Sequence, residues 1–308
     1  MGATKIEWAT HTLNPFVGCA KLSPGCQNCY ALGFAVRMAH NTALPDHVRK
    51  RYAMTVYKIN GKWEWTGQIA LFLARIDEML RWRNPRIVFH GSMGDIFYET
   101  ISFPLLANLF DTMHSANKHI HLILTKRPER MARFITWYQE MWLGSFKSAW
   151  PREYQHIFLG VTVENKAYIW RILELLKIPA AGYFVSHEPA LGMVDYPPEF
   201  LALGKRAWLI AGGETGPKAR PAHPDWFRHD RDQCCVAGTP FFFKSWGAWA
   251  PYRDNGPLPP ECKYVGLDGN IRVGDWEEET DACMGLVGRK RAGRLLDGRE
   301  YSELPISL

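Results

Sequence analysis

The chain has 308 residues, of which 47% are hydrophobic and 22% charged, and its formal net charge is +6. These fractions are ordinary for a folded domain and exclude a wholly disordered chain. No stretch reaches the roughly 18 uncharged apolar residues of a membrane span. The first residues include Glu7 and no apolar run, which is unlike a secretory signal. We therefore expect a cytoplasmic protein with no membrane partner.

Three cysteines follow a short N-terminal segment that we expect to be a strand. Cys19, Cys26 and Cys29 have the spacing C-x6-C-x2-C in a loop rich in Gly, Pro, Ser and Asn. Disulfides are unusual in a cytosolic chain of this size, so a metal ion or a cluster is the better interpretation. A structural zinc ion needs a fourth ligand, which His11 or His40 would have to supply. A 4Fe–4S cluster on three cysteines instead leaves one iron open for a small molecule.

Short apolar runs then recur through the chain, and helix-like segments separate most of them. Runs of four to six apolar residues without strict alternation are typical of strands buried on both faces of a parallel sheet. Their alternation with helices predicts an α/β fold, a (β/α) TIM-like barrel of about seven strands, partial or complete, with a Rossmann-like open sheet as the alternative. The expected strands are 86–90, 120–124, 157–161, 183–186, 207–211 and 240–244, and the expected helices include 32–40, 68–82, 103–116 and 166–176.

Charged residues follow the expected strands directly. In a parallel barrel the active site is built at the C-terminal ends of the strands. Any one of these residues would also fit as a loop charge or a barrel salt bridge, but six polar strand ends in succession favour a functional site. The carboxylates are Asp95, Glu164, Glu188 and Glu214, and the cations are Lys126, Arg127, Arg220 and Lys244.

The C-terminal residues 251–308 differ from the rest in their many Pro and Gly residues and a basic run at 288–294. We expect a barrel over 1–250 and an irregular C-terminal appendage, packed on the barrel, over 251–308. A hairpin is expected around 266–270. The basic run either contacts phosphates or is a solvated face.

Thirteen Trp residues are present, and several lie among polar or Gly- and Pro-rich neighbours. Stacking on a base or nucleoside is one use for such residues, and simple packing is the other. The five in question are Trp63, Trp65, Trp142, Trp246 and Trp249.

The adjacent Cys234 and Cys235 follow a helical stretch and are expected to be buried rather than catalytic.

Taken together, these segments resemble a poorly characterised phage and bacterial family of three-cysteine-motif proteins of the radical S-adenosylmethionine (SAM) type. The resemblance covers nearly the whole chain and is centred on the segment from Asn14-Pro15 to Tyr30-Ala31. The other matching segments are 6–8, 91–95, 124–131, 160–165, 185–189, 212–216, 242–247 and 292–299.

This resemblance implies a 4Fe–4S cluster on Cys19, Cys26 and Cys29, with S-adenosyl-L-methionine on the open iron. It further implies reductive cleavage of SAM to methionine and a 5′-deoxyadenosyl radical that abstracts hydrogen from a substrate. The electron would come from a donor such as flavodoxin or ferredoxin. The usual superfamily spacing is C-x3-C-x2-C, so the first gap is longer here, and Asn28 stands where an aromatic residue is often found.

The positions within the family pattern imply roles for individual residues. Ser92, Gly94 and Asp95 are expected to bind the methionine part of SAM, with Asp95 pairing with its ammonium group. Contacts to the carboxylate and ribose are expected from Thr125, Lys126, Glu164 and Asn165, and Glu214 is expected to touch the ribose or the substrate. The catalytic residues that face the substrate are expected to be Arg127, Glu188 and Lys244, with Arg220 beside them.

The expected substrate is a nucleobase, a nucleotide or DNA that is modified or repaired, because the chain is basic and the resemblance is to phage proteins. A small metabolite or a peptide is the alternative. Two interpretations without SAM chemistry stay open. One is a zinc- or cluster-stabilised nucleic-acid-binding protein without catalysis, and the other is a degenerate barrel that keeps its cluster for structure or redox sensing.

Overall fold

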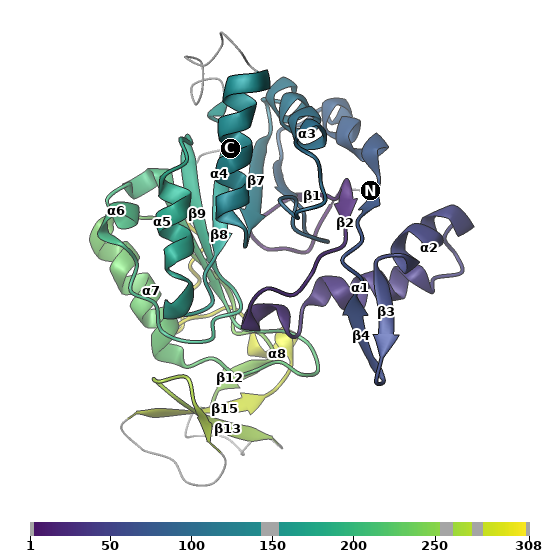
Figure 1. The fold of residues 1–308 in the computed structure, drawn as a ribbon. Coiled ribbons are helices and arrows are strands. Elements are labelled where there is room, and N and C mark those ends of the chain that lie inside the picture. Colours follow the sequence, from purple (N-terminus) through teal and green to yellow (C-terminus); the bar gives the residue numbers. More distant parts are fainter. Residues whose placement is uncertain (1–2, 143–153, 253–260, 273–279, 306–308) are drawn as a thin grey trace. The chain divides into compact units, whose positions relative to one another are not determined.

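A computed structural model describes residues 3–142, 154–252, 261–272 and 280–305 (Figure 1). Its main feature is a seven-stranded sheet with the strand order β1-β6-β7-β8-β9-β10-β11. The pairs β1–β6, β6–β7, β7–β8 and β10–β11 are parallel. The strands are β1 His11–Leu13, β6 Ile87–His90, β7 Ile120–Thr125, β8 Ile157–Thr162, β9 Gly182–His187, β10 Ala207–Gly212 and β11 Phe241–Ser245.

The strand order follows the chain order without a reversal. A doubly wound Rossmann sheet reverses its order at a switch point, whereas a (β/α) barrel does not. Every residue of β8, β9 and β10 is buried, as the continuous apolar runs predict for strands covered on both faces. The prediction of a partial (β/α) barrel is therefore confirmed, and the open-sheet alternative is not.

Helices connect the sheet strands, as expected for βαβ units. Helix α7 has Pro224 in its first turn, a backbone N–H capped by the His223 ring, and Gly238 at φ 68° after its end. The helices of the connections are η2 Leu73–Arg81, α3 Phe103–Ser115, α4 Pro128–Trp137, η3 Tyr138–Trp142, η6 Lys166–Tyr168, α5 Trp170–Leu176, α6 Pro198–Leu201, η7 Gly204–Arg206 and α7 Pro224–Ala237. Among the described residues, no helix is both long and apolar enough to span a membrane.

The helix expected over 68–82 is wrong in its first part. Residues Ala70–Leu71 form strand β5, which pairs antiparallel with β2, Phe16–Val17. The remainder is the 3-10 helix η2 rather than an α-helix. Pairing with β2 holds the backbone of β5 in an extended conformation. The two strands are far apart in the sequence, so the local hydrophobic pattern does not reveal this interaction.

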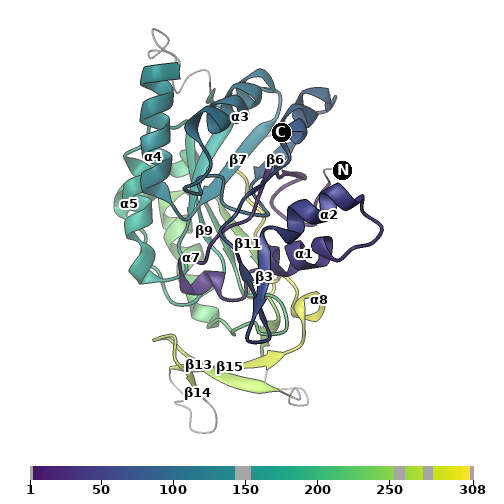
Figure 2. The same cartoon turned by 45° about the vertical axis from the view of Figure 1, so that its right-hand side comes forward.

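The chain divides into two compact units, one formed by Met1–Val161 with Glu174–Tyr183 and the other by Thr162–Leu173 with Phe184–Ser307. In the first unit, the residues that stand between β2 and β5 in the sequence form a small subassembly, which includes the cysteine loop. Figure 2 shows its strand β3 alongside α1 and α2. Its elements are η1 Pro24–Cys26, α1 Tyr30–Ala39, α2 Asp46–Ala53, β3 Val56–Ile59 and β4 Lys62–Trp65. Cys19 and Cys29 pack against its apolar core.

The second unit contains an antiparallel sheet with the order β12-β15-β13-β14. Strands β13 and β14 pair antiparallel across residues 267–270, which confirms the expected hairpin. The elements are β12 Trp249–Pro251, β13 Cys262–Gly266, β14 Ile271–Arg272, β15 Asp281–Leu286 and the short helix α8 Arg289–Ala292 in the basic run. The domain boundary at residue 250 stays a prediction.

Three of the five tryptophans considered for stacking are buried, which agrees with the alternative of simple packing. Trp65, Trp246 and Trp249 are 8%, 5% and 1% exposed. The indole N–H groups of Trp246 and Trp249 donate to backbone carbonyls 2.9 and 2.7 Å away, which satisfies them in the interior. Trp63 is half-buried against the core of the subassembly, and the Trp142 side chain lies outside the described residues.

Cys234 is buried as expected, whereas Cys235 is exposed.

Candidate functional site

The cysteine loop is fastened to the loop that follows β6. The Asn14 amide donates to the Ser92 hydroxyl at 2.9 Å and accepts from the Met93 N–H at 3.0 Å. The Gly18 N–H donates to the Met93 carbonyl at 3.2 Å. Beyond the cysteines, the Tyr30 hydroxyl donates to the Ser92 carbonyl at 2.7 Å. The loop bearing the three thiols is therefore held at both ends against residues 91–95.

Gly94 lies where the backbones of the two loops approach each other closely. A Cβ atom on Gly94 would lie 2.4 Å from the Gly18 carbonyl oxygen, closer than real side chains allow. Gly18 and Gly94 also form a parallel bridge, and Cys19 follows Gly18 directly. The missing side chain of Gly94 thus permits the contact that places Cys19. Its expected contact to SAM stays a prediction.

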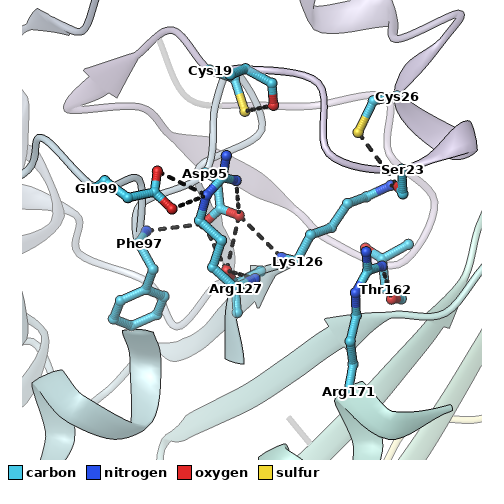
Figure 3. A network of polar contacts seen from close by, with 12 residues as sticks. Cys19, Ser23, Cys26, Asp95, Phe97, Glu99, Lys126, Arg127, Thr162 and Arg171 are labelled. Atoms are coloured by element: carbon cyan, nitrogen blue, oxygen red, sulfur yellow. Dashed lines mark hydrogen bonds and ion pairs between the residues drawn. The ribbon is translucent and has the colours of Figure 1, made fainter. Parts of the chain in front are cut away.

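The Asp95 carboxylate is the centre of a buried hydrogen-bond network at the ends of β6 and β7 (Figure 3). It accepts from the Thr125 hydroxyl at 2.7 Å, the Lys126 N–H at 3.0 Å, the Phe97 N–H at 2.9 Å and the Arg127 guanidinium at 3.0 Å. A carboxylate has about four acceptor sites, so these donors fill it. The structure thus gives Asp95 an organising function, and its expected bond to an ammonium group stays a prediction.

Arg127 is held between two carboxylates. Its guanidinium bonds Asp95 and also Glu99 at 3.0 Å, and it lies 4.8 Å from the centroid of the Tyr98 ring. Burial alone would lower the pKa of Arg127, but the charges of Asp95, Cys19 and Glu99 raise it overall. Arg127 is therefore a permanent buried cation within electrostatic reach of Cys19. A direct contact to substrate stays a prediction.

The Lys126 side chain extends from this network to the cysteine loop (Figure 3). Its ammonium donates to the Ser23 hydroxyl at 3.1 Å, and that hydroxyl lies 3.6 Å from the Cys26 sulfur. Burial raises the pKa of the Cys26 thiol, but the charge of Lys126 and hydrogen bonds from Leu22 and Ser23 outweigh it, so the pKa is lowered. Lys126 thus favours the thiolate form of Cys26.

The other two thiols are less acidic than that of Cys26. Burial raises the pKa of Cys19 to about 12, with a contribution from Asp95 and opposition from Arg127. Burial also raises the pKa of Cys29, although the N–H groups of Ala31 and Leu32 at the start of α1 oppose it. None of the seven cysteines is in a disulfide. Among the described residues, no group of three or more His, Cys, Asp or Glu side chains is arranged to hold a single metal ion.

In the second unit, two ion pairs lie at the C-terminal ends of neighbouring strands. Lys244 at the end of β11 bonds Glu188, which follows β9. The Glu214 carboxylate, after β10, accepts from the backbone N–H and the guanidinium of Arg220 at 2.6–2.9 Å. Both acids are paired with the cations that the sequence places at strand ends.

Gly213 explains part of the sequence Gly212-Gly213-Glu214 at the end of β10. A Cβ atom on Gly213 would lie 2.0 Å from the Trp246 carbonyl oxygen. The segment therefore allows the ends of β10 and β11 to approach closely. Contact of Glu214 with ribose or substrate stays a prediction.

Glu164 and Asn165 both bond to other groups of the protein. Glu164 is fully buried and bonds Arg171 at 2.9 Å, and the same guanidinium donates to the Thr162 carbonyl at 2.8 Å. The Asn165 amide oxygen accepts from the Ala167 N–H at 3.0 Å and caps η6. These partners give both residues structural functions, and their expected contacts to SAM stay predictions.

The structure thus brings together the three cysteines, Ser92, Gly94, Asp95, Thr125, Lys126 and Arg127 within the first unit. Sequence reasoning missed four residues that organise the sites: Asn14, Ser23, Glu99 and Arg171. Asn14 and Ser23 lie in the loop that was singled out for its composition, but only their hydrogen bonds reveal what they do. Glu99 and Arg171 are charged residues away from the strand ends, and nothing in the local sequence marks them.

A family model described as "Protein of unknown function (DUF5131)" matches residues 3–305. The chain belongs to the DUF5131 family. Among curated proteins none matches this DUF5131 sequence. One solved structure similar to it is a cysteine-to-serine mutant of spore photoproduct lyase, with 9% identity over 94% of this chain and 72% of the other, and a TM-score of 0.39. A likeness at that level supports no inference about the reaction of this DUF5131 protein.

Proposed function

We propose that this protein is a radical SAM enzyme in which Cys19, Cys26 and Cys29 hold a 4Fe–4S cluster. The observation that best supports the proposal is the dipeptide Lys126–Arg127, whose two cations act on thiols of one loop. When bound, the cluster and SAM would supply reductive cleavage of SAM, with one electron from an external donor, to give methionine and, with a hydrogen atom taken from the substrate, 5′-deoxyadenosine.

The donor set suits such a cluster. Cysteine thiolates are the ligands that iron–sulfur clusters use. The charge of Cys26 raises the pKa of both Cys19 and Cys29, so the three sulfurs are within electrostatic reach of one another. With high pKa values, Cys19 and Cys29 would release protons on binding iron. The three ligands then concentrate negative charge, which Lys126 and Arg127 offset.

Each residue around the thiols has a distinct positioning function. Asp95 accepts from the backbone N–H of Lys126 and from the Arg127 guanidinium, and so fixes the backbone at Lys126 and the side chain of Arg127. Ser23 connects Lys126 to Cys26. The N-terminal N–H groups of α1 lower the pKa of Cys29 against the effect of burial, and they favour its thiolate form.

For the substrate, we propose Glu188 and Lys244 as the catalytic pair and a nucleobase, nucleotide or DNA as the class. Their side chains are 20% and 14% exposed, so the ion pair is reachable by a ligand. An ammonium beside a carboxylate can donate a hydrogen bond or a proton to a substrate oxygen or nitrogen. Salt-dependent affinity for DNA would favour the polymer over a nucleotide or a small metabolite.

The test is the formation of 5′-deoxyadenosine. Protein purified and reconstituted with iron and sulfide under anaerobic conditions is mixed with SAM and dithionite, and the product is measured by chromatography. Wild type is expected to form it, and Cys26→Ala is expected to form none. Cys235→Ala is the matched control, because Cys235 is exposed and lies outside the loop.

The other interpretations predict different results. A colourless protein that contains zinc would overturn the proposal in favour of a zinc-stabilised binding protein. A brown protein that contains iron and sulfide but never cleaves SAM would favour a cluster for structure or redox sensing. Loss of product in both cysteine variants would also contradict the assignment of the three ligands.

A further inference from the structure

Residues 20–73, which include Cys26, Cys29 and the β3–β4 hairpin, have an unusual surface. They contain seven Lys and Arg residues against two Asp and Glu residues, so they carry +5 of the chain's net +6. They also hold seven of the fourteen exposed large hydrophobic side chains among the described residues. Isolated exposed apolar residues are normal, but a concentration of them with a charged rim marks an interaction site.

The β3–β4 hairpin gathers part of this surface on one face. Val56 pairs with Trp65, and both are buried in the core of the subassembly. Because side chains alternate along a strand, the next pair, Tyr57 with Glu64, projects to the opposite side. The following pair on that side is Ile59 with Lys62.

This outer side of the hairpin adjoins the cysteine loop. The Lys21 ammonium bonds the Glu64 carboxylate at 2.7 Å, and Lys21 lies between Cys19 and Cys26 in the sequence. Leu22 follows it and is 50% exposed, while Tyr57 and Ile59 are 43% and 48% exposed. We name Lys21, Leu22, Tyr57, Ile59 and Lys62 the hairpin face.

The chemistry of the hairpin face fits a protein rather than a nucleic acid. Nucleic-acid interfaces are polar and strongly cationic, whereas Leu22, Tyr57 and Ile59 supply apolar contact area. Protein interfaces combine an apolar centre with a charged rim, and complementary charge steers the encounter. Lys21 is paired with Glu64, so Lys62 and the net charge of +5 over residues 20–73 favour an acidic partner.

We propose that the hairpin face is the docking surface for a small acidic one-electron carrier protein. This identification of the partner rests on the proposed function, because a cluster must receive an electron and the face adjoins the loop of its ligands. One electron passes from the reduced carrier to the oxidised cluster. The carrier is oxidised by one electron, and no bond is formed or broken.

Two reductants separate docking from chemistry. Dithionite is small and needs no docking surface, whereas photoreduced flavodoxin is an acidic protein carrier. With dithionite, Lys62→Glu and Tyr57→Ser/Ile59→Ser are expected to form 5′-deoxyadenosine at the wild-type rate. With flavodoxin, both variants are expected to be at least tenfold slower. Val236→Ser and Lys205→Glu, at exposed positions outside the hairpin face, are the controls and should match wild type.

Direct binding completes the test. Oxidised flavodoxin is titrated onto the full-length protein by calorimetry at low and high salt. The affinity is expected to fall with salt and to be at least tenfold weaker in the hairpin variants. Equal flavodoxin-driven rates in wild type and variants would overturn the proposal, as would variants that lose affinity for a DNA duplex but not for flavodoxin. If dithionite yields no product in wild type, the proposed function fails, and the binding measurement still decides on the hairpin face.

Discussion

Asp95 and Arg127 form a buried ion pair, with an Oδ2–Nη1 distance of 3.0 Å and both side chains only 8% exposed. The pair joins the loop after β6 to the residues after β7. Because Asp95 also accepts from Thr125 and from the backbone N–H of Lys126, it holds the segment that carries both cations that act on the cysteines. The cysteine site therefore depends on a carboxylate that contacts no sulfur.

Replacing Asp95 should be costly to the fold. In Asp95→Ala the Arg127 guanidinium stays buried with only Glu99, whose side chain is 61% exposed, as a charged partner. Breaking a buried pair from one side costs about 3–5 kcal/mol, and we expect the free energy of unfolding to fall by that amount. Urea denaturation measures it. Glu99→Gln is the control and should cost less than about 1 kcal/mol. Equal losses in the two variants would contradict a central function for Asp95.

Gly94→Ala tests the contact between the two loops. The new methyl group would meet the Gly18 carbonyl, so we expect the cysteine loop to be displaced at a cost of about 1–3 kcal/mol in stability. Iron and sulfide content after reconstitution should fall sharply, while circular dichroism stays native. Gly33→Ala in α1 is the matched control, because nothing lies within 4 Å of its Cβ position. A Gly94 variant that retains its full iron content would argue against this contact.

The fold could be predicted from the sequence because its signals are local. Each buried strand is a short apolar run, such as 157–161, and most of these runs are followed by a helical pattern. The order of the strands then follows from the rule that βαβ connections join neighbouring strands. The helix predicted over 68–82 was wrong in its first part because the signal there is not local: β5 exists only through its pairing with β2, which is distant in the sequence.

The candidate site could be predicted only in part. The strand-end rule located Asp95, Lys126 and Arg127. The family resemblance gave each of them a ligand, whereas the structure pairs them with protein groups. Hydrogen bonds such as that of Asn14 to Ser92 join residues 78 positions apart. Such partners are set by the tertiary fold, and a single sequence carries no signal for them.

Arg171→Leu tests the function of Glu164. The Glu164 carboxylate and the Arg171 guanidinium are both almost fully buried, so removing the cation takes the ion-pair partner away from a buried charge. We expect the free energy of unfolding to fall by about 3–5 kcal/mol, and Glu164→Gln/Arg171→Leu to recover part of that loss. Urea denaturation of the single and double variants measures the coupling. If Glu164 instead serves only SAM, Glu164→Gln would weaken SAM binding without loss of stability.

A group of buried histidines should make the protein sensitive to acid. His90 on β6 and His121 on β7 share a hydrogen bond of 2.9 Å, and the ring of His156 lies 5.7 Å from that of His121. Burial lowers the pKa of His90 to about 3. Burial, together with the charges of neighbouring histidines, also lowers the pKa of His121 and His156. All three rings are therefore neutral in the folded protein at pH 7.

The sign of the effect follows from proton binding. Between pH 6.5 and the lowered pKa values the unfolded chain binds more protons than the folded one, so stability is lost as the pH falls through this window. Each histidine contributes up to about 1.4 kcal/mol per pH unit, and none contributes above about pH 7. Urea denaturation at pH 7.5, 6.5 and 5.5 should show this slope, and His90→Asn should reduce it. Val88→Ala on the same strand is the control, because it lowers stability equally at each pH. A wild-type slope no steeper than that of His90→Asn would contradict the prediction.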